Sequence, residues 1–162
     1  MPRCIPFANT AVKQAASLAL AAALGVFMTV QARAGDAPIM HVEKTATCGC
    51  CHAWVERMSA AGFEVRARDV TQDALTQMKI AMGITPETSS CHTAAIGGYV
   101  VEGHVPAADI RRLLAEAPAA RGISVPGMPM GSPGMDFNDE REPYEVVLIG
   151  EDGALSTFSR HE

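Results

Sequence analysis

The sequence predicts an α/β domain in which a mixed sheet has helices on both faces. Segments with strand-like and helix-like hydrophobic periodicity alternate from residue 38 to residue 116, in the order β-α-β-α-β-β-α. A Cys-x-x-Cys pair, Cys48 and Cys51, falls between the first strand and the first helix. There the helix N-terminus lowers the pKa of a thiol and favours its thiolate. This order of elements, with the motif in this place, is typical of a thioredoxin-like fold.

Most elements carry their own signal in the sequence. Phe63, Val65 and Ala67 alternate with charged residues, which is the period of a half-buried strand. Gly62 and Gly83 end the two helices on either side of that strand. The expected strands are 38–44, 63–70, 91–96 and 99–102, and the expected helices are 51–61, 71–82 and 107–116.

The C-terminal part of the chain departs from this plan. Residues 126–135 consist of Pro, Gly, Met and Ser alone, so they cannot form a helix and make a poor strand. An acidic loop follows, and then two apolar segments, 144–149 and 154–159, flank a Gly-containing turn as a β-hairpin. We therefore expect a thioredoxin-like domain at 35–120 and a C-terminal extension at 121–162 that packs on it.

The first 34 residues have the pattern of a cleaved signal peptide. Arg3 and Lys13 provide a positive n-region, the stretch 17–30 is apolar, and Ala32-Arg33-Ala34 is a small-residue cleavage signal. The apolar stretch is short for a membrane span, although a retained anchor is the alternative. We expect export across the inner membrane to the periplasm, with no membrane attachment after cleavage.

The charge of the expected mature chain limits its partners. Without Arg3, Lys13 and Arg33, 10 basic residues stand against 18 acidic ones, which gives a net charge of −8. Such an acidic chain is not expected to bind nucleic acid. Its length suits a single domain, and we expect a monomer.

Four cysteines remain after cleavage: Cys48, Cys50, Cys51 and Cys91. An even number in an exported protein normally indicates disulfides, and Cys48–Cys51 and Cys50–Cys91 bridges are both conceivable. Three of the four lie on one loop, however, so they cannot link distant parts of the chain. Cys91 is expected to open the third strand and to face the Cys-x-x-Cys pair. We therefore interpret the cysteines as a chemical site.

The spacing of the sulfurs favours copper over zinc. Four thiolates can close a tetrahedral zinc site, but adjacent Cys50 and Cys51 are poor partners on one ion because neighbouring side chains diverge. Thiolates that bridge several Cu(I) ions escape this constraint. Met thioethers are soft ligands that select Cu(I) together with Cys, and the Pro/Gly-rich loop carries three of them: Met128, Met130 and Met135.

Other interpretations of these side chains remain open. The methionines could instead fill the core beneath a long loop. A single histidine is more often a surface or hydrogen-bonded residue than a ligand. Among His52, His92 and His104, His104 is the first candidate because it closes a strand next to a glycine.

Four motifs together resemble the CopG-type copper-resistance proteins: Cys48-Gly-Cys-Cys, Ser90-Cys-His-Thr, Glu102-Gly-His-Val-Pro and the Pro/Gly/Met run at 126–135. The resemblance covers essentially the whole mature chain. It implies a periplasmic thioredoxin-like domain with a C-terminal extension that binds copper at the cysteine motif. It also implies a copper oxidoreductase.

We therefore expect a periplasmic copper-binding protein that serves copper resistance. Its cysteine cluster would hold several copper ions and interconvert Cu(I) and Cu(II). Cys48 and Cys51 are the catalytic candidates. The candidate metal ligands are Cys48, Cys50, Cys51, Cys91, His104, Met128, Met130 and Met135. A copper efflux system or a periplasmic copper carrier is the expected partner. The alternatives are a metal-independent thiol–disulfide oxidoreductase and a non-catalytic copper chaperone or store.

Overall fold

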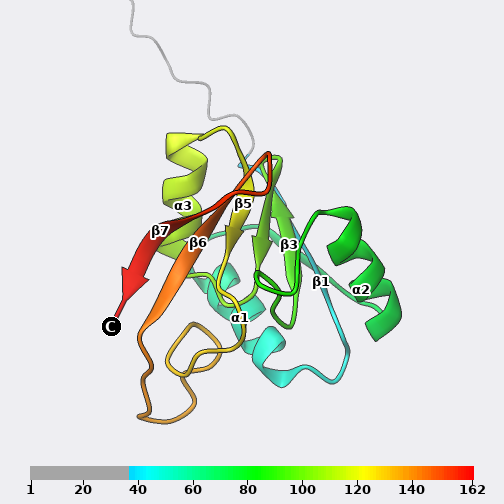
Figure 1. The fold of residues 1–162 in the computed structure, drawn as a ribbon. Coiled ribbons are helices and arrows are strands. Elements are labelled where there is room, and N and C mark those ends of the chain that lie inside the picture. Colours follow the sequence, from blue (N-terminus) through cyan, green and yellow to red (C-terminus); the bar gives the residue numbers. More distant parts are fainter. Residues whose placement is uncertain (1–36) are drawn as a thin grey trace, which may run out of the picture. The chain divides into compact units, whose positions relative to one another are not determined.

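The computed structural model describes residues 37–162, so the expected signal peptide lies outside the described residues. Within them the chain forms seven strands and three helices (Figure 1). The strands are β1 (Met40–Lys44), β2 (Val65–Asp69), β3 (Thr93–Ile96), β4 (Tyr99–Glu102), β5 (Ala120–Ser124), β6 (Tyr144–Gly150) and β7 (Leu155–His161). The helices are α1 (Gly49–Ala60), α2 (Gln72–Ala81) and α3 (Ala107–Glu116). No helix in this part of the chain is both long enough and apolar enough to span a bilayer.

The seven strands form one mixed sheet in the order β2-β1-β3-β4-β5-β6-β7. The β1/β2 and β4/β5 pairs are parallel, and the other neighbours are antiparallel. The predicted mixed α/β class is therefore confirmed. The thioredoxin-like assignment stays a prediction, based on the order of the elements.

Different helices cover the two faces of the sheet. On one face, a buried row of paired residues crosses β1, β3, β4 and β5: Val42, Ala94, Val101 and Ile123. Helices α1 and α3 complete this core with Trp54, Met58, Ile110 and Leu113. Burial of each large apolar side chain stabilises the fold by about 1.5–3 kcal/mol. On the opposite face, Lys79 of α2 reaches Thr93 and Glu102.

Strand β5 was not predicted from the sequence. Its centre is Gly122, and glycine inside a strand weakens the strand signal. In the structure a Cβ at this position would lie 1.9 Å from the carbonyl oxygen of Val100, so only glycine allows β5 to approach β4. The expected boundary between domain and extension falls at the first residue of this strand. Strands β5, β6 and β7 continue the same sheet, with β6 and β7 as the expected hairpin.

The Met/Pro/Gly loop joins β5 to β6 and folds back beside α1 (Figure 1). Main-chain hydrogen bonds close short turns inside it: the Ser132 amide donates to the Pro129 carbonyl at 3.2 Å, and the Met135 amide donates to the Ser132 carbonyl at 2.8 Å. Its glycines at 127, 131 and 134 have positive φ, the conformation that these turns require. The loop is thus built to reach the end of the sheet where α1 begins.

Candidate metal centre

The N-terminus of α1 brings three of the cysteines together. Cys48 is the N-cap residue, and its Sγ accepts a hydrogen bond from the Cys51 amide at 3.3 Å, the role that an oxygen side chain usually has. Cys51 is buried in the first turn, on the helix face that also buries Trp54. Cys48 and Cys51 form a disulfide, whereas Cys50 is a free thiol.

The fourth sulfur comes from the bend just before β3. Cys91 precedes the strand, which starts two residues later than predicted. Its Sγ lies 3.3 Å from Cys51 Sγ and 3.9 Å from Cys50 Sγ. The Sγ atoms of Cys48 and Cys50 are 3.6 Å apart. The structure therefore gathers the four cysteines whose grouping the sequence predicted.

His104 approaches the sulfurs from the end of β4. Its Nε2 lies 3.0 Å from Cys91 Sγ, and its Nδ1 lies 2.8 Å from the carbonyl oxygen of Pro133. A carbonyl only accepts, so Nδ1 carries the proton and donates to Pro133. The lone pair of Nε2 therefore points to Cys91. A ring nitrogen fixed by a backbone carbonyl, with the other nitrogen free, is the arrangement typical of a metal-ligating histidine.

His92, which the sequence favours less than His104 as a ligand, is a second buried imidazole. Its ring packs on Trp54 with the ring centroids 4.4 Å apart, and its Nδ1 lies 3.4 Å from Cys91 Sγ. Its Nε2 is buried without a hydrogen-bond partner among the described residues. Adjacency to Cys91 was the available signal in the sequence. His52, by contrast, is exposed and pairs with Glu56.

Burial sets the protonation of these groups. Together with negative charge on Cys50, it raises the pKa of the Cys91 thiol to about 12. Burial also lowers the pKa of His92 well below its usual value, with His104 and Lys79 adding to the effect. It lowers the pKa of His104 too, against its hydrogen bond to Pro133. Near pH 7 both imidazoles are neutral and available as ligands, while a metal must displace the Cys91 proton.

The Met/Pro/Gly loop covers this site. A Cβ at Gly134 would lie 2.6 Å from the Cys50 carbonyl oxygen and 2.9 Å from the Trp54 amide nitrogen, so glycine lets the loop touch the start of α1. An Arg57–Asp136 ion pair of 2.6 Å holds the loop to the same helix.

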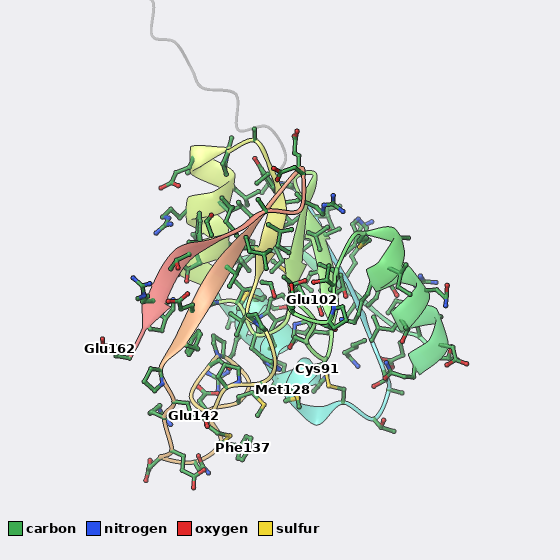
Figure 2. The ribbon with its side chains drawn as sticks, in the orientation of Figure 1. Cys91, Glu102, Met128, Phe137, Glu142 and Glu162 are labelled. Carbon is green, nitrogen blue, oxygen red and sulfur yellow. A yellow bond between two sulfur atoms is a disulfide. The ribbon has the colours of Figure 1, made fainter. Side chains whose placement is uncertain are left out.

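The three methionines of this loop lie at different depths. Met135 is buried, Met130 is half-buried and Met128 is about half exposed, at 51%. Met128 lies at the same end of the sheet as Cys91 (Figure 2).

The donor atoms fall into two overlapping groups. One comprises Cys48, Cys50, Cys51 and Cys91, of which Cys48 and Cys51 become thiolate donors only when their disulfide is reduced, and the other comprises Cys91, His92 and His104. Within each group the ligand atoms lie within 4.8 Å of one another. Cys91 Sγ belongs to both groups, and a thiolate can bridge two metal ions. Sulfur and imidazole donors without a carboxylate suit a soft ion such as Cu(I).

Comparisons with known proteins agree with this site. The family model "Protein of unknown function, DUF411" matches residues 88–135, which contain Cys91, both buried histidines and the three methionines. No curated protein matches the chain at a significant level.

Two solved structures, described as copper resistance protein CopG, forms 2 and 1, are 40% and 39% identical to this chain, with TM-scores of 0.72 and 0.71. The matches cover 78% and 76% of this chain and 99% and 98% of those proteins. At this identity and coverage, the chain belongs to the CopG family of copper resistance proteins.

Proposed function

We propose that this protein serves copper resistance by binding several copper ions on bridging thiolates and interconverting Cu(I) and Cu(II). The observation that carries this proposal is the position of Cys91 Sγ, which belongs to both groups of clustered donor atoms. The similarity to copper resistance proteins supports the choice of metal. The ligands we propose are the four cysteines, His104 and the methionines of the covering loop, with His92 added because its Nδ1 lies 3.4 Å from Cys91 Sγ.

The proposed redox step uses the Cys48–Cys51 pair. Oxidation of the two thiols forms one S–S bond and releases two protons and two electrons, which reduce two Cu(II) to two Cu(I). The disulfide then leaves the Cys50 and Cys91 sulfurs as soft donors beside the imidazoles. In the reverse direction, two Cu(I) give up their electrons, and the disulfide returns to two thiols with the uptake of two protons.

An anaerobic single-turnover experiment tests this step. The reduced protein receives two equivalents of Cu(II), Cu(I) is measured with a Cu(I)-specific chelator, and the disulfide is located by mass spectrometry. We expect two Cu(I) and one Cys48–Cys51 disulfide per chain. Cu(II) that stays unreduced, with all four thiols intact, would support a non-catalytic store instead. Parent protein that binds no copper at all would favour the metal-independent thiol–disulfide oxidoreductase.

We propose a cleaved signal peptide at 1–34, a periplasmic location, a thioredoxin-like domain at 35–120 and an extension at 121–162. We further propose that the monomer exchanges copper with an efflux system or a periplasmic copper carrier. The half-exposed thioether of Met128, on the loop that covers the site, gives such exchange a soft ligand at the surface.

Replacing Met128, Met130 and Met135 together by leucine should weaken copper retention without harming the fold. Leucine keeps the apolar volume but removes the thioether, and such a swap usually costs less than about 1.5 kcal/mol each. Competition with a Cu(I) chelator measures retention, and thermal unfolding of the copper-free protein measures stability. Parent-like copper retention combined with lower copper-free stability would instead make the three residues core fillers.

A further inference from the structure

A buried ion pair lies beneath residues 90–92, on the sheet face that α2 covers. Lys79 of α2 contacts Glu102 of β4, and their side chains are 9% and 0% exposed. Both charges have lost most of their hydration, which is unfavourable unless each group is fully hydrogen-bonded. The pair is not part of either group of sulfur and imidazole donors.

The hydrogen bonds of Glu102 reach the main chain beside Cys91. Its Oε1 accepts from Lys79 and from the amide of Ser90, the latter at 2.7 Å. Its Oε2 accepts from the hydroxyl of Thr93 at 2.6 Å, while Lys79 also donates to the Thr93 oxygen at 3.0 Å. Ser90 is the residue immediately before Cys91.

The chain is held on the other side of Cys91 as well. The Gly103 amide donates to the carbonyl of His92 at 3.0 Å. The side chain of Glu102 therefore holds the main-chain amide of the residue before Cys91, and the main chain of Gly103 holds the carbonyl of the residue after it. Figure 2 shows Glu102 inside the fold and Cys91 at the end of the sheet below it.

An apolar pair in place of Lys79 and Glu102 would be expected to give a fold at least as stable, since such replacements are often neutral or stabilising. An apolar side chain, however, cannot accept a hydrogen bond from the Ser90 amide. A carboxylate bonded to three donors gives a direction to that peptide that hydrophobic packing does not. The ion pair therefore contributes mainly by fixing the main chain at Ser90, and not by adding to the stability of the fold.

We propose that Glu102, held in place by Lys79, is a positioning residue for the metal centre. Its carboxylate fixes the peptide at Ser90 and thereby aims Cys91 Sγ at the point shared by the two donor groups. This inference rests on the copper function proposed above. It gives the glutamate of the Glu-Gly-His motif a role separate from that of His104.

Two double variants isolate this role: Lys79→Met/Glu102→Leu and Lys79→Met/Glu102→Gln. Neither leaves a buried charge without its partner. The side-chain oxygen of glutamine can still accept a hydrogen bond from the Ser90 amide, and its side-chain NH₂ group can donate one to the Thr93 hydroxyl oxygen. Leucine can form neither hydrogen bond. The two variants therefore differ in the acceptor for the Ser90 amide and in the donor to Thr93.

We expect the leucine variant to hold Cu(I) about 10–100-fold more weakly than the parent in chelator competition, the range typical of lost outer-shell contacts. The glutamine variant should bind within about threefold of the parent. In copper-free protein, the Ser90 amide should exchange hydrogen faster in the leucine variant only. Unfolding of the copper-free variants should remain cooperative.

Three results would overturn the inference. In the first, the leucine variant binds copper as the parent does. In the second, both variants lose copper equally, so the acceptor is irrelevant. In the third, the leucine variant fails to fold while the glutamine variant folds, which would assign the network to stability. Failure of the proposed copper function is recognised separately, because the parent itself would then bind no copper.

Discussion

Replacing Cys91 by serine is expected to reduce bound Cu(I) from several ions to at most one per chain, with at least about 100-fold weaker retention. Cys91 Sγ belongs to both groups of donor atoms, so its loss disconnects the histidines from the other sulfurs. A hydroxyl is a hard donor that stays protonated near pH 7 and does not replace a bridging thiolate. The measurement is the copper content after anaerobic loading and competition with a Cu(I) chelator.

The fold of this variant should persist. Cys91 is half-buried, and a serine hydroxyl can still donate to His104 Nε2. We expect a stability change of about 1 kcal/mol or less in copper-free unfolding. His52→Ala is the matched control, because this histidine is exposed and lies outside both donor groups. If the Cys91→Ser protein keeps the copper content of the parent, the Cys91 thiolate is not a bridging ligand.

Replacing Cys50 by serine should give the second largest loss of copper, of about 10–100-fold in retention. Cys50 is not needed for a Cys-x-x-Cys redox couple, because the disulfide joins Cys48 and Cys51. Its sulfur lies between the sulfurs of Cys48 and Cys91, at 3.6 and 3.9 Å. It is therefore placed to bridge them through metal.

The Cys50 variant also separates copper chemistry from plain thiol chemistry. Reduction and reoxidation of the Cys48–Cys51 disulfide should proceed as in the parent while bound copper falls. Thiol counting before and after oxidation and metal analysis on the same sample give both quantities. Unchanged copper content would return the metal-independent thiol–disulfide oxidoreductase to first place among the explanations.

The cysteine part of the site could be predicted from the sequence, because Cys48, Cys50 and Cys51 lie within four residues at the start of a helix. The place of Cys91 followed from the order of strands and helices, although β3 begins after it and not at it. The other contacts depend on groups without a local signal. The acceptor for His104 is a main-chain carbonyl 29 residues away, at Pro133.

The fold was less predictable where backbone contacts override propensity. Strand β5 has a glycine at its centre because β4 approaches closely there. Local strand propensity does not predict such a contact between distant parts of the chain. The role of Glu102 was hidden for a related reason. From the sequence, a charged residue at the end of an apolar strand is expected at the surface. Only the structure shows that Lys79 on the neighbouring helix pairs with Glu102 and allows its burial.

Anaerobic titration of the fully reduced protein with Cu(I) tests the central claim most directly. Two overlapping donor groups with a shared sulfur predict more than one tightly held Cu(I) per chain, in competition with a chelator of known affinity. Zinc should bind at no more than one equivalent, or more weakly. Saturation at a single copper ion per chain would contradict a bridged cluster and leave a mononuclear site.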